Sequence, residues 1–236
     1  MKKLHEKASK LNIELDEHQL SQFRQYYEML IEKNKVMNLT AITEFEEVID
    51  KHFMDSLLLT NVMDLSSVKT VIDVGTGAGF PGIPLKLAFP HLEVTLLDSL
   101  NKRVGFLNEV IDALSLSGIQ AVHSRAEEGA RNKAYRDHFD LCVSRAVANL
   151  QVLSEYCLPY VRLDGHFISY KSKDIEEELA QSKNAIHILG GSLEQTYSCP
   201  IPDTEILRQF VIIRKVQKTP KAYPRKAGTA AKSPIQ

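Results

Sequence analysis

Apolar side chains recur at three- and four-residue spacing through the first 66 residues, a pattern typical of amphipathic helices. Two apolar stripes are each preceded by residue types that begin helices: Asp16 as an N-cap, and Thr43 with Glu46 at the spacing of a capping box. The stripes contain Leu20, Phe23, Tyr27 and Leu30, then Phe45, Val48, Ile49, Phe53 and Leu57. Residues 1–66 are therefore predicted to form a helical subdomain.

From residue 69 onward the pattern changes to short β-branched runs that alternate with helical stretches. The predicted strands cover residues 70–74, 93–97, 119–123, 139–143 and 166–170. The predicted helices cover residues 82–88, 101–116, 149–158 and 174–189. Such alternation predicts a parallel sheet with helices on both faces. Two final apolar runs, at 193–199 and 209–216, are expected to pair antiparallel. The predicted fold class is α/β, with a seven-stranded mixed sheet, the last strand antiparallel, and an N-terminal helical extension.

Charge is distributed unevenly along the chain. The formal net charge is −1, yet residues 206–236 hold eight basic residues and no acidic ones. We therefore predict a helical subdomain at 1–66, a sheet domain at 67–217 and a flexible basic tail at 218–236. A basic tail on an acidic body favours an anionic partner such as nucleic acid. A tail that only keeps the protein in solution fits the charge equally well.

Membrane and metal functions find no support in the sequence. The longest apolar runs fall far short of the roughly 18 residues needed to cross a bilayer, and the polar residues 1–6 do not resemble a signal peptide. Cys142, Cys157 and Cys199 are too few and too scattered for a zinc site or a disulfide framework, so we expect buried thiols. We predict a cytoplasmic protein that binds neither membrane nor metal.

One glycine-rich segment carries the chemistry. It reads Asp73-Val-Gly75-Thr-Gly77-Ala-Gly-Phe80-Pro-Gly and directly follows the first predicted strand. Glycines allow a tight turn and close approach of a ligand, and the helix that follows offers free amides. Asp98 ends the next strand, where an acid can accept hydrogen bonds from both hydroxyls of a ribose. Strand, loop, helix and acid together predict a nucleotide-type cofactor site.

Two cofactor classes compete for this site. A dinucleotide needs a bare helix N-terminus for its pyrophosphate, whereas Pro81 removes one amide donor and Asp73 adds negative charge. S-adenosylmethionine has no phosphate and carries a cationic amino-acid end, so Asp73 favours it. The alternative is that Asp73 only binds amides of the loop. A nicotinamide-dependent oxidoreductase on a Rossmann fold therefore stays open as an alternative function.

The glycine motif and several other segments together resemble one family. These segments are Phe80-Pro81-Gly82-Ile-Pro84, Asn38-Leu39-Thr40, Lys51-His52-x-x-Asp55, Leu97-Asp98-Ser99, Lys102-Arg103, Ser124-Arg125-Ala126-Glu127 and Ser144-Arg145-Ala146-Val147-Ala148. The chain resembles the bacterial small-subunit rRNA guanine-N7 methyltransferase G family, also called the glucose-inhibited division protein B family, over roughly residues 20–215. The resemblance implies a class I S-adenosylmethionine-dependent methyltransferase fold. It further implies a monomer that methylates N7 of a guanosine in the 530-loop region of 16S rRNA in the small ribosomal subunit.

The same resemblance implies a donor site at the carboxyl ends of the strands. Its residues are Asp73, Gly75, Gly77, Phe80, Asp98, Ala126, Glu127 and Arg145. Ala126 and Glu127 would flank the adenine, and Arg145 would face donor and substrate as the positioning residue. A structural role is the alternative for Glu127, as a carboxylate near a helix N-terminus. The alternative for Arg145 is an ion pair with Asp73 or Asp140.

The residues implied for RNA contact are Asn38, His52, Lys102, Arg103 and Lys171. Guanine N7 presents an unprotonated lone pair, so no general base is needed, and catalysis rests on positioning and exclusion of water. We therefore expect His52, Asp55 and Ser56 to line the mouth of the site instead of forming a hydrolase triad. A donor-binding regulatory or ribosome-assembly protein remains the second alternative.

Overall fold

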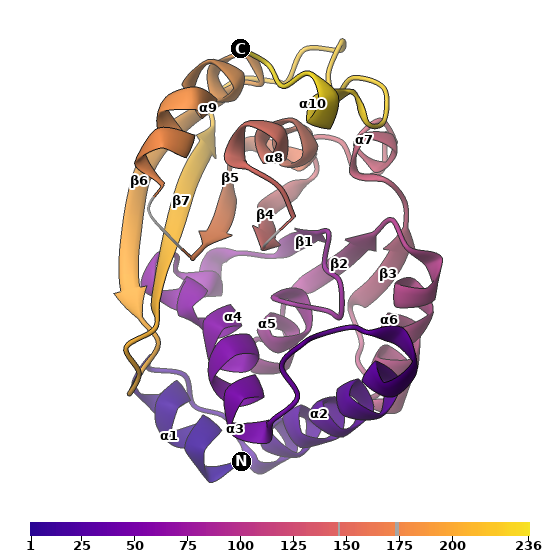
Figure 1. Ribbon diagram of the computed structural model, residues 1–236, viewed down its shortest axis with the longest axis vertical. Coiled ribbons are helices and arrows are strands. Elements are labelled where there is room, and N and C mark those ends of the chain that lie inside the picture. Colours follow the sequence, from indigo (N-terminus) through magenta and orange to yellow (C-terminus); the bar gives the residue numbers. More distant parts are fainter. Residues whose placement is uncertain (146, 173–174) are drawn as a thin grey trace.

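The computed structural model describes residues 1–145, 147–172 and 175–236. A seven-stranded sheet lies between two layers of helices (Figure 1). Its strands are β1 (Thr70–Val74), β2 (Glu93–Asp98), β3 (Ile119–His123), β4 (Phe139–Arg145), β5 (Val161–Lys171), β6 (Gly191–Pro200) and β7 (Leu207–Lys215). The strand order is β3-β2-β1-β4-β5-β7-β6, with β7 antiparallel to both neighbours. The predicted mixed sheet with an antiparallel last strand is confirmed.

The central strands are buried on both faces, which explains why they read as nearly continuous apolar runs. Strand β5 begins earlier than predicted, at Val161, because Val161 already pairs with Phe139 before the register shifts at Leu141. The carboxyl ends of β1, β4 and β5 meet at one edge of the sheet. In parallel α/β sheets this edge is where ligands bind.

The N-terminal region is helical, as predicted. Its elements are α1 (Lys2–Ser9), α2 (Glu17–Met37), α3 (Phe45–Val48), the π-helix η1 (Ile49–Met54), α4 (Asp55–Leu57) and the 3-10 turns η2 (Leu58–Asn61) and η3 (Leu65–Ser67). Asp16 caps α2 and forms a capping box with Gln19. The predicted Thr43 cap is wrong: α3 begins one residue later, after Glu44, and no side chain caps it.

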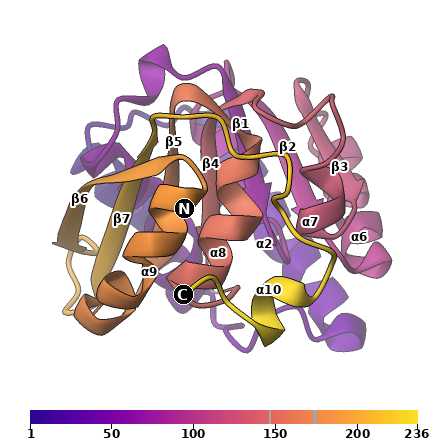
Figure 2. The same ribbon diagram turned by 90° about the horizontal axis from the view of Figure 1, so that it is seen from above.

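The remaining helices cover the two faces of the sheet. They are α5 (Gly82–Ala88), α6 (Asn101–Ala113), α7 (Ala126–Gly129), α8 (Leu150–Cys157), the 3-10 turn η4 (Leu158–Tyr160), α9 (Glu176–Ile188) and α10 (Thr229–Lys232). Helices α2, α4, α5 and α6 lie on one side, and α7, α8 and α9 on the other (Figures 1 and 2). The N-terminal helices share one hydrophobic core with the first face, from Leu4 through Phe53 to Ile168. The three cysteines are free and buried.

The C-terminal segment 218–236, for which the sequence predicts a flexible tail, packs over the second helical layer (Figure 2). Arg225 pairs with Glu155 of α8, and Arg136 donates to the carbonyl of Thr219. Ala230 and Ile235 are buried. The segment is therefore packed where a flexible tail was predicted. Most of its contacts use backbone groups, and the basic composition of the tail does not reveal these. No helix within the described residues is long and apolar enough to span a membrane.

Candidate active site

The glycine loop turns sharply at the end of β1. Gly75 and Gly77 have φ angles of +73° and +63°, a region that favours glycine. The amides of Gly75 and Thr76 both donate to the carbonyl of Leu97, at 2.8 and 3.2 Å. These two hydrogen bonds fix the loop against the end of β2.

Asp73 holds the two ends of this loop together. Its Oδ2 accepts hydrogen bonds from the Thr76 hydroxyl at 2.7 Å and from the Gly82 amide at 2.8 Å. The side chain is fully buried, and burial raises its pKa to about 6, although both hydrogen bonds and the Arg145 guanidinium act in the opposite direction. Its Oδ1 is buried without a partner among the described residues. These contacts match the structural alternative, in which Asp73 organises the loop.

The N-terminal helices hold the other side of the loop. The buried Tyr26 hydroxyl of α2 donates to the carbonyl of Ala78 at 2.6 Å. Phe80 packs against the rings of Tyr26 and Phe53, and it stacks on His52 with 4.5 Å between ring centroids. The helical extension is therefore part of the site and sets the position of the glycine loop.

A pocket of about 280 Å³ opens beside the loop at the carboxyl ends of β1, β2 and β3. We call it the glycine pocket, and it is lined by Val74, Gly75, Leu97, Ser99, Ser124, Arg125, Ala126, Glu127, Val147, Tyr156, Gly228 and Ala231. Among the residues predicted for the donor, it brings together Gly75, Ala126 and Glu127. The other predicted donor residues are absent from this lining of described residues: Asp73, Gly77, Asp98, Phe80 and Arg145. For the last two the reason is plain. Their side chains meet elsewhere, with the Arg145 guanidinium 5.2 Å from the Phe80 centroid.

Asp98 and Glu127 bring carboxylates to the region of the glycine pocket. Asp98 accepts hydrogen bonds from the amides of Gly77 and Leu100, both at 2.9 Å, and pairs weakly with Arg103 at 3.4 Å. Glu127 is buried and accepts a hydrogen bond from the Gly228 amide at 2.7 Å. Glu127 lies in the first turn of α7, as its structural alternative supposed, and is also linked to the C-terminal segment, a contact that neither the prediction nor the alternative included.

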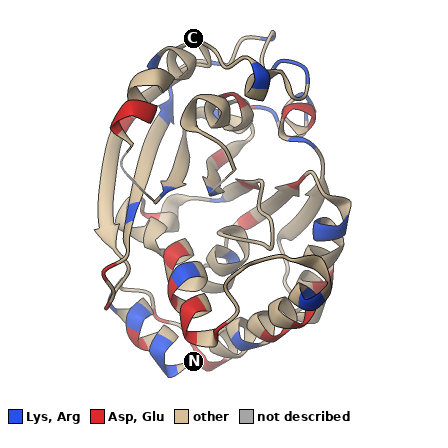
Figure 3. Cartoon of the chain, in the orientation of Figure 1, with Lys and Arg blue, Asp and Glu red and all other residues tan. Residues whose placement is uncertain are grey.

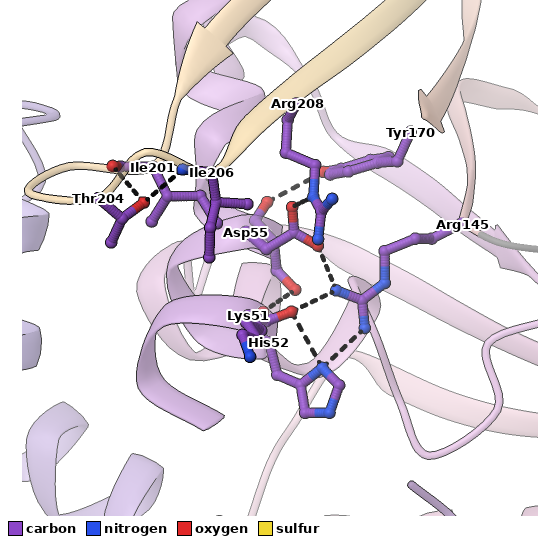
Figure 4. Close-up of polar contacts among 10 residues, drawn as sticks. Lys51, His52, Asp55, Arg145, Tyr170, Ile201, Thr204, Ile206 and Arg208 are labelled. Atoms are coloured by element: carbon purple, nitrogen blue, oxygen red, sulfur yellow. Dashed lines mark hydrogen bonds and ion pairs between the residues drawn. The ribbon is translucent and has the colours of Figure 1, made fainter. Parts of the chain in front are cut away.

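A second pocket, of about 330 Å³, lies at the ends of β4 and β5 and faces η1. We call it the arginine pocket, and it is lined by Ile42, Lys51, His52, Asp55, Arg145, Tyr170, Lys171, Ser172 and Arg208. Asp55 lies between two guanidinium groups (Figure 4). Its Oδ2 is 2.5 Å from Nη1 of Arg145, and its Oδ1 accepts from Nε of Arg208. Arg145 therefore pairs with Asp55, and not with Asp73 or Asp140 as its structural alternative supposed.

His52 projects from the π-helix into the arginine pocket. Its Nε2 lies 2.9 Å from the Thr40 hydroxyl, and its Nδ1 lies 3.3 Å from Nη2 of Arg145. Burial and the neighbouring Arg145 lower the pKa of His52 to about 3. The imidazole is therefore neutral near pH 7. The same Nδ1 also lies 3.1 Å from the carbonyl of Lys51, which can only accept, whereas Arg145 can only donate, so the two contacts of Nδ1 call for opposite tautomers.

The Ser56 hydroxyl is held by the backbone of its own helix. It is fully buried and donates to the backbone carbonyl of His52 at 2.6 Å, one helical turn before it. The Tyr170 hydroxyl donates to the Ser56 carbonyl at 2.9 Å. The expectation that His52, Asp55 and Ser56 do not form a hydrolase triad agrees with this geometry.

Comparison with known proteins decides the family. The family model described as rRNA small subunit methyltransferase G matches residues 19–207. The chain belongs to this family. A ribosomal RNA small subunit methyltransferase G from Lachnoclostridium phytofermentans is 54% identical over 95% of this chain and 93% of its own length. The protein of the same name from Exiguobacterium sibiricum is 50% identical over 94% of each chain.

Solved structures share the fold of this methyltransferase G chain. The mitomycin 7-O-methyltransferase MmcR superposes with a TM-score of 0.54 at 16% identity, over 70% of this chain and 54% of its own. TrmN from Thermus thermophilus gives a TM-score of 0.50 at 15% identity, over 71% of this chain and 53% of its own. The architecture is that of class I S-adenosylmethionine-dependent methyltransferases.

The residues predicted to contact RNA do not form one cluster. His52 and Lys171 line the arginine pocket, where Lys171 pairs with Glu178 at 2.6 Å. Arg103 pairs with Asp98, next to the glycine loop, and Lys102 is exposed on α6. Asn38 ends α2 in a left-handed conformation with φ of +49°. Figure 3 shows basic residues at the tips of β4 and β5, where Arg145 and Lys171 end their strands.

Sequence reasoning missed Arg208, which it counted only as one of the basic residues near the C-terminus. The residue in the sequence that could have pointed to Arg208 was Asp55. An acidic residue on the buried face of a helix requires a cationic or hydrogen-bonding partner, and β7 was predicted to reach the same sheet. Thr40, the partner of the His52 ring, was noted only for its resemblance to the family.

Proposed function

We propose that this methyltransferase G protein transfers the methyl group of S-adenosylmethionine to N7 of a guanosine in 16S rRNA, in the 530-loop region of the small ribosomal subunit. The observation that carries the proposal is the adjacency of two different pockets at one sheet edge. Val74 of β1 lines the glycine pocket, Arg145 of β4 lines the arginine pocket, and β1 pairs directly with β4. A donor in one pocket and a base in the other would meet at the ends of these strands.

The glycine pocket suits a cationic donor. Glu127 lines it, Asp98 follows the lining residue Leu97 in the chain, and Asp98 accepts a hydrogen bond from the Gly77 amide, which a phosphate would need as its own donor. These carboxylates would repel a pyrophosphate and attract the sulfonium and ammonium groups of S-adenosylmethionine. This electrostatic argument favours a methyl donor over a nicotinamide dinucleotide. When bound, the donor supplies an activated methyl group.

The arginine pocket suits a nucleobase and its phosphate backbone. Arg145 and Arg208 provide donors for the O6 of guanine or for a phosphate, while Asp55 balances one of their two charges. His52 is neutral and stacks on Phe80, so it offers a hydrogen-bonding edge without adding charge. Direct attack by N7 requires no proton to be removed, so the neutral His52 does not have to act as a base. Arg145 would act by positioning the guanine.

The decisive experiment measures transfer of labelled methyl to small ribosomal subunits, protein-free rRNA and bulk protein, using RNA that lacks the modification. Nuclease digestion should give labelled 7-methylguanosine, and Arg145→Ala should reduce the label while donor binding persists. Donor binding without any label would favour the assembly or regulatory alternative. Binding of a nicotinamide dinucleotide in place of the methyl donor would favour the oxidoreductase. We further infer a cytoplasmic monomer, which sedimentation of the purified protein would check.

A further inference from the structure

We propose that Gly228 and Ala231 of the C-terminal segment are part of the methyl-donor site: they wall the adenine end of the glycine pocket, and Gly228 fixes the orientation of Glu127. This inference rests on the proposed function, because it assigns the glycine pocket to S-adenosylmethionine. It changes the role of the basic tail from an RNA-binding or solubilising extension to a donor-binding element.

The first observation is the lining of the pocket. Gly228 and Ala231 face the same cavity as Gly75, Leu97 and Ala126, although more than 95 residues separate them in the chain. Gly228 has a φ of +80°, which turns the chain toward the pocket at the start of α10. The pocket is therefore incomplete without the C-terminal segment.

The second observation is the hydrogen bond from the Gly228 amide to Oε1 of Glu127, at 2.7 Å. Glu127 is buried, and a buried carboxylate needs donors. With Oε1 occupied by the tail, the orientation of the carboxylate is fixed and Oε2 remains for a further donor. The exocyclic amine of adenine is such a donor. A tail that releases Gly228 would leave Glu127 free to rotate and with one hydrogen bond fewer.

The third observation is how firmly the segment is anchored on both sides of Gly228. Arg225 donates from Nη2 to Oε2 of Glu155 at 2.6 Å, from Nε to Oε1 at 3.0 Å, and from its amide to Oε1 at 2.7 Å. Glu155 lies on α8 and is only 1% exposed. Arg131 donates to the Pro224 carbonyl, and the buried Ile235 follows α10. An element this well anchored is preorganised for binding, so the donor does not have to order it.

The test measures the Kd of S-adenosylmethionine for the full-length protein by calorimetry. Ala231→Trp places a large ring at the pocket wall from an exposed position, so folding is unaffected. We expect its Kd to rise by at least about tenfold. Lys232→Trp is the matched control, because Lys232 is exposed and does not line the pocket, and its Kd should stay within about twofold of the wild type.

A second pair of variants tests the anchor. Arg225→Ala removes the contacts with Glu155 and should raise the Kd by about three- to tenfold, because binding must then order the segment. Lys226→Ala removes the same charge at an exposed neighbouring position and should leave the Kd unchanged. If the wild-type protein binds S-adenosylmethionine and the Kd values of Ala231→Trp and Arg225→Ala equal those of their controls, this inference alone is refuted. Wild-type protein that binds no donor would refute the proposed function, and this inference with it.

Discussion

Replacing Asp55 should lower stability and methyl transfer while leaving donor binding unchanged. Its carboxylate is fully buried between Arg145 and Arg208, whose side chains are 16% and 19% exposed. Removing one partner of a buried ion pair typically costs about 3–5 kcal/mol, because it leaves charge without compensation. Both arginines keep some contact with solvent, so we expect Asp55→Ala to cost about 3 kcal/mol, at the low end of this range.

For a chain of this size, 1 kcal/mol corresponds to a shift in Tm of about 2–4 °C, so the expected decrease is about 6–12 °C. Methyl transfer should fall strongly, since Arg145 loses the group that orients its guanidinium. The Kd of the donor should change little, because Asp55 does not line the glycine pocket.

The assays are thermal and urea unfolding, calorimetric donor binding, and transfer to small subunits at a temperature where the variant is folded. Asp164→Asn is the control: Asp164 forms an exposed pair with Arg214, and its loss should cost less than about 1 kcal/mol. An Asp55→Ala protein as stable as this control would contradict the argument from burial. Full transfer activity in a folded Asp55→Ala protein would contradict the positioning role of Arg145.

Three further predictions follow from buried groups. The pKa of Asp73 is raised from 3.8 to about 6, so between these values the unfolded state loses its proton first. Wild-type stability relative to Asp73→Asn should therefore fall by about 2 kcal/mol as the pH rises from 4 to 7; a difference that is independent of pH in urea titrations would refute this. The pKa of His52 is lowered to about 3, so its NMR signal should not titrate between pH 8 and 5, and a midpoint near 6.5 would be inconsistent with its burial. The stability that the buried neutral His52 contributes is lost as the pH falls below 6.5, because the imidazole is then protonated in the unfolded state but not in the folded state. Tyr26→Phe should cost about 1–3 kcal/mol by leaving the Ala78 carbonyl without its donor, and should weaken donor binding; an unchanged Tm in thermal unfolding would argue against it.

Local patterns in the sequence predicted the sheet well, because each central strand is bounded by strong turn signals. The bounds of β1, β3 and α5 agree with the predicted ranges at both ends. Errors appeared where tertiary contacts decide the ends. β5 extends toward its start because β4 offers a partner there, and α3 begins at Phe45 without the predicted Thr43 cap.

The candidate site was less predictable, because its decisive contacts join residues far apart in the chain. Asp55 and Arg208 are 153 residues apart. They meet only because the antiparallel register pairs Gln209 of β7 with Lys171, at the end of β5. Composition counted Arg208 only among the basic residues of 206–236, and no local pattern distinguishes an arginine that neutralises a buried acid from one that faces solvent.

The two pockets also indicate how the chain divides its functions. The sheet supplies Gly75, Asp98 and Arg145 at the ends of parallel strands, an arrangement available to any protein of this fold. Each pocket is then completed by a segment outside the sheet: η1 and α4 supply His52 and Asp55 to the arginine pocket, and the C-terminal segment supplies Gly228 to the glycine pocket. Because distant solved structures share the fold at 15–16% identity, the fold alone does not select a substrate. Selectivity for donor and acceptor should therefore depend on the two ends of the chain, and substitutions there should change what binds without unfolding the sheet.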